Sequence, residues 1–132
     1  MASWWDKNPG RLLTEAEKME KYTNAQFLLL DGSKLPDGFS PGAHMAWVEI
    51  ITSNSGCRYM ITIICQKDHP YSAPAAWISE AHIGEQHHMF KNGRLCLHDS
   101  YLSPDETYVL NIRNWACEWI ECYETGNWPE SA

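Results

Sequence analysis

The sequence lacks any long apolar run. No segment approaches the roughly 20 apolar residues that a membrane-spanning helix requires. The stretch from Met1 to Gly10 has no basic start followed by an apolar core, so no secretory signal is expected. We therefore expect a cytoplasmic protein that does not act at a membrane.

Basic residues are also scarce. The 132 residues include 10 Lys and Arg against 17 Asp and Glu, and the formal net charge is −7. After Cys96 there are seven acidic residues and a single basic one, Arg113. Direct nucleic-acid binding is not expected, because neutralising phosphates needs a basic stripe. The acidic C-terminal portion would steer a basic protein surface, or it is simply a solvated helix face.

The five cysteines lack the paired spacing of a disulfide framework, so we interpret them as thiols. Cys65, Cys117 and Cys122 lie in segments that are predicted to be regular, and they are expected to be core or near-core residues. Cys57 adjoins a turn and is expected to be exposed.

Composition and length predict one globular domain over residues 1–132. The chain is 44% hydrophobic and 20% charged, with a mean hydropathy of −0.44, values typical of a folded protein. A chain of this length can bury a substantial core. No internal repeat or low-complexity tract is present.

Two capping boxes predict helices at the two ends of the domain. Thr14–Glu17 predicts a helix start, and apolar residues continue from there at helical spacing. Ser103–Glu106, with Pro104 at the first helical position, predicts a second helix that runs to Gly126. We expect the second helix to pack across one face of a sheet.

The central part of the chain predicts an antiparallel sheet. Phe27–Leu30 is a short apolar run, and residues 44–65 alternate with period two around a turn at Asn54–Gly56. Ala75–Ser79 adds a fourth strand, and a meander is the simplest topology. The fold class is therefore α+β. One face of the first hairpin strand is expected to carry Met45, Trp47, Glu49 and Ile51.

Cys96 is the candidate nucleophile of the irregular segment that follows the sheet. It lies within Lys91–Asp99, where a glycine turn leads into an apolar–Cys–apolar triplet. Cationic groups or backbone amides can convert an ordinary thiol into a reactive thiolate. The groups that could do so are Arg94, His98, His87 and His88. Alternatively, Cys96 is a small apolar residue that closes a strand.

Two other chemistries fit these residues less well. His87, His88, Cys96 and His98 lack the C-x2-C or H-x3-H spacing of a tetrahedral zinc site. His98 could act as the base of a Cys–His hydrolase, but no hydrolase motif surrounds it. No metal or cofactor is expected.

The tryptophans fall into two groups. A core position is expected for Trp47, Trp77, Trp115 and Trp119. Residues near the termini, which are Trp4, Trp5 and Trp128, either fold back as anchors or form a partner surface together with the acidic residues.

Three motifs in this order resemble those of the ubiquitin-conjugating enzyme family. The Tyr-Pro-Phe-x-Pro-Pro turn of that family matches His69–Pro74, and its Gly-x-Ile-Cys-Leu motif matches Gly93–Leu97. Its Ser-Pro element before the next helix matches Leu102–Glu106. The resemblance spans residues 14–125. The family's His-Pro-Asn motif is absent, and His88 stands eight residues before Cys96.

The resemblance implies the ubiquitin-conjugating enzyme-like fold and a thioester-forming transferase with Cys96 as nucleophile. Arg94 would favour the thiolate, and His87 or His88 would assist at the oxyanion or as a base. Gly126–Pro129, after a Trp-rich helix, resembles the compact bacterial branch found in antiphage (CBASS-type) operons. There the C-terminus of a cGAS-like nucleotidyltransferase is the expected acyl donor, and a ubiquitin-like protein is the alternative.

The donor tail would then lie extended beside Cys96, between residues 82–92 and 100–104. A non-catalytic binding module of the same fold is the alternative function.

Overall fold

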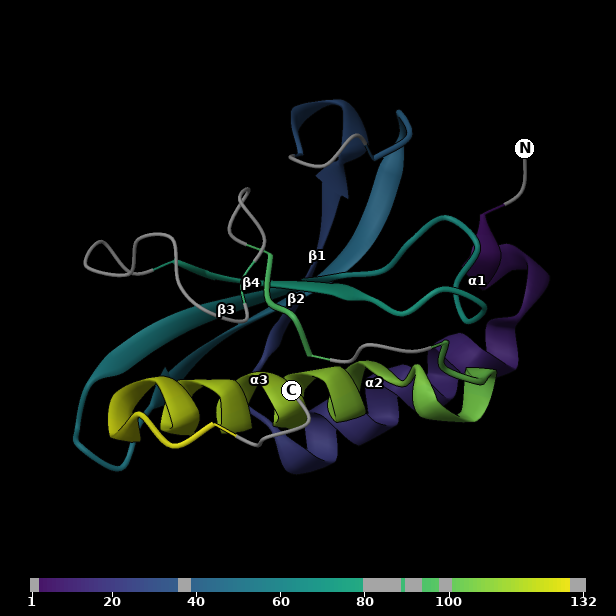
Figure 1. Cartoon of the computed structure of the whole chain (residues 1–132). Coiled ribbons are helices and arrows are strands. Elements are labelled where there is room, and N and C mark those ends of the chain that lie inside the picture. The colour runs from purple at the N-terminus through teal and green to yellow at the C-terminus, as the bar shows by residue number, and fades with distance from the viewer. Residues whose placement is uncertain (1–2, 36–38, 80–88, 90–93, 98–100, 129–132) are drawn as a thin grey trace.

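The computed structural model describes residues 3–35, 39–79, 89, 94–97 and 101–128. The predicted α+β class is confirmed, with N-terminal helical structure, a four-stranded antiparallel sheet and a C-terminal helix (Figure 1). In chain order, the elements are α1 (Trp4–Lys7), α2 (Pro9–Tyr22), β1 (Gln26–Asp31), η1 (Gly32–Lys34), β2 (Ala43–Thr52), β3 (Arg58–Ile64), β4 (Ala75–Ser79), η3 (Pro104–Glu106) and α3 (Val109–Thr125).

The sheet is the predicted meander, in the order β1-β2-β3-β4 with each strand antiparallel to its neighbour. The β2–β3 turn places Gly56 at a φ of 91°, where a residue without a Cβ is at no disadvantage. Ser53 N donates a hydrogen bond to Cys57 O across this turn at 2.8 Å. The predicted hairpin is thus confirmed.

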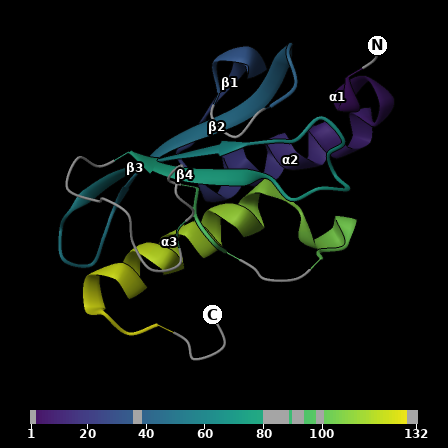
Figure 2. The ribbon, with the colours of Figure 1, turned by 45° about the horizontal axis from the view of Figure 1, so that its top comes forward.

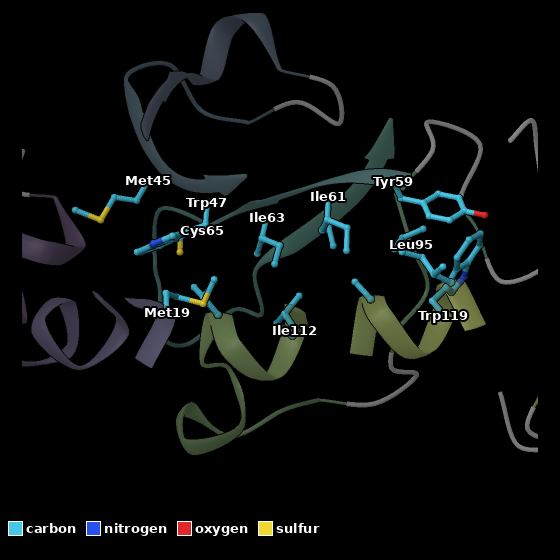
Figure 3. Packing of buried hydrophobic residues seen from close by; sticks show 14 of the residues in the cluster. Met19, Met45, Trp47, Tyr59, Ile61, Ile63, Cys65, Leu95, Ile112 and Trp119 are labelled. Carbon is cyan, nitrogen blue, oxygen red and sulfur yellow. The ribbon is translucent and has the colours of Figure 1, made fainter. Parts of the chain in front are cut away.

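The main core lies between one face of the sheet and the helices α2 and α3 (Figures 1 and 2). The side chains of Trp47, Ile61 and Ile63 point from the sheet toward the helices. Met19 of α2 and Ile112 of α3 meet them from the opposite side (Figure 3). The face predicted for β2 is therefore the face that is buried.

This inner face includes one acidic residue, Glu49. Its carboxylate accepts two hydrogen bonds from Arg113 of α3, from Nε to Oε1 at 2.8 Å and from Nη2 to Oε2 at 3.2 Å. Asn24 N also donates to Oε2 at 3.0 Å. A buried carboxylate needs such partners, so Glu49 joins β2 to α3 and to the residues before β1.

The outer face of the sheet is only partly covered. A second cluster of buried residues combines Phe39, from the segment between η1 and β2, with Ala46, Ile64 and Ala75 of the strands. Farther along the same face, Ile50 is 55% exposed. The sheet therefore has a closed helical side and a half-open outer side.

The N-terminal helix begins earlier than predicted. Asn8 is the N-cap of α2, its Oδ1 accepts a hydrogen bond from Arg11 N at 3.1 Å, and Pro9 occupies the first helical position. Thr14 lies inside the helix, where its hydroxyl donates to Gly10 O. The prediction of a start at Thr14 was wrong because Asn8 and Pro9 form the cap one turn and a half upstream.

The second capping box begins a shorter helical element than predicted. Ser103 and Glu106 form the box, but it caps η3, and α3 begins only at Val109. The end of α3 agrees with the prediction, because Gly126 adopts the left-handed C-cap conformation with a φ of 76°.

Trp4 folds back onto the domain. Its side chain is 5% exposed, and its ring contacts that of His69 edge-on, with centroids 4.6 Å apart. Trp5 and Trp128 are half-buried against the main core. The anchor interpretation is therefore confirmed for Trp4. Among the described residues, no helix has the length and apolar character of a membrane span.

Candidate functional site

Cys96 follows a two-residue segment that extends the sheet. Arg94 pairs with Trp77 of β4, and Leu95 pairs with Met89, both as antiparallel bridges. Leu95 N donates to Ala76 O at 2.9 Å, and the Leu95 side chain is buried in the main core. One backbone hydrogen bond and one buried side chain thus fix the position of Leu95, the residue immediately before Cys96.

The Cys96 thiol is half-buried. Burial raises its pKa, because removal from water disfavours the charged form, and the nearby positive charge of Arg94 opposes this rise. The expected influence of Arg94 is thus present. The expected net lowering of the Cys96 pKa is not seen, because the effect of burial is larger than that of Arg94.

The turn before β4 is held by its own hydrogen bonds. Asp68 O accepts from Tyr71 N at 2.9 Å, and Asp68 Oδ2 accepts from the Ser72 hydroxyl at 2.8 Å. The His69–Pro70 peptide is cis. Tyr71 remains 65% exposed at the tip, so this turn presents an aromatic side chain to solvent.

A groove of about 370 Å³ lies between this turn and the residues that precede η3. Tyr71, Ser72 and Ala73 line one side, and Tyr101 and Leu102 line the other.

Arg94 also lines this groove, whereas Cys96 is not among its described lining residues. The groove therefore has two tyrosines, Tyr71 and Tyr101, and one basic residue, Arg94, among its described lining residues, and Arg94 lies two positions before Cys96 in the sequence.

The two sides of this groove are connected by a buried polar network that the sequence analysis missed. Glu15 of α2 is fully buried, and it accepts hydrogen bonds from Arg11 Nε at 3.1 Å and from Val109 N at 2.9 Å. His69 Nε2 binds the same carboxylate. The only signal in the sequence was the i, i+4 spacing of Arg11 and Glu15, which is common on exposed helix faces.

Arg11 and Thr107 complete the network. The Arg11 guanidinium donates to Pro104 O at 2.9 Å and to Thr107 Oγ1 at 3.1 Å. Thr107 Oγ1 in turn lies 2.6 Å from Pro70 O, to which it donates. These bonds join α2, the turn at 69–74 and the start of α3, so they fix the segments on which the groove depends.

The structure brings two of the four predicted site residues together. Arg94 and Cys96 are neighbours, and the charge of the former acts on the latter. His87 and His88 lie outside the described residues, as do His98 and most of the 82–92 segment. Within the described residues, no group of three or more His, Cys, Asp or Glu side chains could hold a metal ion.

Two of the acidic residues of α3 have partners in the β2–β3 hairpin. Glu124 accepts hydrogen bonds from the hydroxyls of Ser53, Ser55 and Tyr59, and Glu121 accepts from the Asn54 side chain at 2.9 Å. These carboxylates attach α3 to the β2–β3 turn.

Comparison of the chain with protein-family models, with curated proteins and with solved structures found no match in any of the three.

Proposed function

We propose that this chain is a thioester-forming conjugating enzyme of the ubiquitin-conjugating enzyme-like family, with Cys96 as its nucleophile. The observation that carries the proposal is the position of Cys96 directly after Leu95, a buried residue hydrogen-bonded to the edge of β4. A nucleophile held by rigid elements and left half-exposed can meet a macromolecular acyl donor.

The order of elements supports the same family. A helix, a four-stranded meander, a Pro-containing turn, the cysteine segment and a C-terminal helix follow one another in the order that the resemblance implies. The described motif residues 69–74, 94–97 and 102–106 fall between or beside these elements, which supports the resemblance.

The proposed chemistry has two steps. The Cys96 thiolate attacks the carbonyl carbon of an activated C-terminal acyl group, and an S–C bond forms while the bond to the leaving group breaks. That acyl group must arrive as an adenylate or a thioester made by another protein. An acceptor amine then attacks the thioester, the C–N bond forms, and Cys96 leaves as thiolate while the amine loses a proton to a base.

Arg94 and one of two histidines would support these steps. The Arg94 charge lowers the pKa of Cys96 against the effect of burial, and it would be most useful when the thiolate forms. His87 or His88 is proposed as the oxyanion donor or as the base for the amine proton. The proposed acyl donor is the C-terminus of a cGAS-like nucleotidyltransferase in bacterial antiphage defence, with a ubiquitin-like protein as the alternative donor.

A non-catalytic binding module of the same fold is the second candidate. The raised pKa of Cys96 favours it, because a neutral thiol is a poor nucleophile. Under this alternative the groove beside Arg94 would hold a partner without any covalent bond.

Mass spectrometry after co-expression with the neighbouring genes distinguishes the two functions. An enzyme should carry an adduct on Cys96 that reductant removes, and Cys96→Ala should lack it. Cys57→Ala, at an exposed thiol on the β2–β3 turn, is the matched control and should keep the adduct. A stable complex with no adduct would favour the binding module.

A further inference from the structure

An apolar groove lies between the helix α2 and the strands β1 and β2. Its volume is about 630 Å³. On the sheet side, Met45 and Trp47 are buried and form its floor, whereas Phe27 is 51% exposed and forms a wall. The rings of Phe27 and Trp47 contact each other edge-on at 5.4 Å, which holds this wall upright.

The apolar surface extends along β1 beyond the residues that line the groove. Leu29 follows Phe27 on the same face of β1, pairs with Met45 and is also exposed. β1 is an edge strand of the sheet, so the apolar surface continues to the edge of the sheet.

The α2 wall follows one stripe of the helix. Its lining residues are Pro9, Leu12, Leu13, Ala16 and Glu20, which recur at the spacing of a single helix face. Leu13 is 61% exposed even though it lies in the middle of this stripe. From Pro9 to Glu20 there are eleven steps along the helix, which correspond to about 16 Å along its axis, or about three turns.

The charge that lines the groove is negative, and the exposed flank of α2 beside it carries both an acid and a base, Glu17 and Lys21. Among the described lining residues, Glu20 is the one that carries a charge, and Glu17 lies exposed beside Leu13 on the same helix. Lys18 lies on the opposite side of α2, over the ring of Tyr108 at 4.8 Å. The chain as a whole carries a net charge of −7.

We propose that this groove binds a basic amphipathic helix of another protein. Three turns of apolar wall match the i, i+3/i+4, i+7 anchors that such a helix presents, and a Lys or Arg on its rim would meet Glu20. A second copy of this chain is a poorer occupant, because two molecules of charge −7 repel each other. The proposal is independent of the chemistry at Cys96.

The test uses synthetic peptides of about four helical turns and the full chain labelled with ¹⁵N. One peptide carries Leu at i, i+3, i+4 and i+7 with Lys elsewhere, the second is its scrambled form, and the third has Glu in place of Lys. We expect the basic helix to bind at least about tenfold more tightly than the other two. We also expect this peptide to change the NMR chemical shifts of the backbone amides of Leu12, Phe27 and Trp47 in the labelled chain, and that of the Trp47 indole.

Variants then locate the binding surface. Leu13→Ala and Phe27→Ala should each weaken binding of the basic helix by about tenfold, and Glu20→Lys should weaken it while improving binding of the acidic peptide. Ile50→Ala, at an equally exposed apolar side chain on the outer sheet face, is the matched control and should bind as the wild type does. Circular dichroism of each variant verifies that it is folded.

Three outcomes would overturn the proposal. The first is equal binding of the basic and scrambled peptides, and the second is a set of shifts that avoids the groove. The third is a concentration dependence of the groove signals without peptide, which would assign the surface to a second copy of the chain.

Discussion

Glu15 and His69 form a buried hydrogen bond between α2 and the turn before β4, although 54 residues separate them in sequence. The same carboxylate accepts from the first backbone amide of α3 and from Arg11. A single side chain therefore connects two helices and a turn, which are the elements that surround the groove beside Arg94.

Replacement of Glu15 by Gln should destabilise the fold by about 3 kcal/mol, because it leaves the buried Arg11 guanidinium without its counter-charge. Urea unfolding of the full chain measures this change. Glu17→Gln, at an exposed position half a turn away, should stay within about 0.5 kcal/mol of the wild type. Equal stability of the two variants would show that the network contributes nothing.

Stability should fall in acid through Glu124. Its pKa is lowered, first by the hydrogen bond from Tyr59 and then by those from Ser53 and Ser55, against an ordinary value of 4.5. A lowered pKa in the folded state means that the stabilisation is present above about pH 4.5 and is lost as the pH falls through the folded value.

Urea midpoints of the wild type and Glu124→Gln should therefore differ at pH 7 and converge at acidic pH. Glu118→Gln, on the exposed side of α3, should show no such convergence. Parallel pH profiles for the wild type and Glu124→Gln would contradict the assignment.

Trp4 should anchor the N-terminal residues. Trp4→Ala should lower the free energy of unfolding by about 3 kcal/mol, because it removes a large side chain that is buried against His69. Trp5→Ala, at a half-buried ring next in sequence, should cost clearly less. Thermal unfolding of both variants decides this, and equal losses would contradict the anchor.

Arg94 should lower the pKa of Cys96. Arg94→Gln should move the pH midpoint for alkylation of Cys96 upward, whereas Arg94→Lys should keep it near that of the wild type, because the charge is retained. Peptide mass mapping follows each thiol separately, and exposed Cys57 is the internal reference. A midpoint that falls in Arg94→Gln would contradict this influence.

Local patterns predicted the sheet well because its strands are defined by alternation. The face that carries Trp47 and Ile51 could be identified from period two alone, and Gly56 marked the turn. Helix starts were harder, because a capping pattern such as Thr14–Glu17 also occurs inside a helix when a better cap, Asn8, lies upstream.

Long-range contacts could not be predicted in this way. The burial of Glu15 depends on His69 and Val109, which are remote in sequence and become neighbours only in the fold. The same holds for Trp4, whose burial follows from its contact with His69. The proposal of Cys96 as the nucleophile rests on its motif, and that of Arg94 on its position two residues earlier in the sequence.

The most direct test of a thioester at Cys96 is to co-express Cys96→Ser with the neighbouring genes and to measure by intact mass whether an adduct forms and survives reductant. A serine nucleophile forms an oxyester in place of a thioester. We therefore expect an adduct of the same acyl mass that survives reductant on Cys96→Ser, that reductant removes from the wild type, and that never forms on Cys96→Ala. An adduct that persists on Cys96→Ala, or the absence of any adduct on both the wild type and Cys96→Ser, would contradict it.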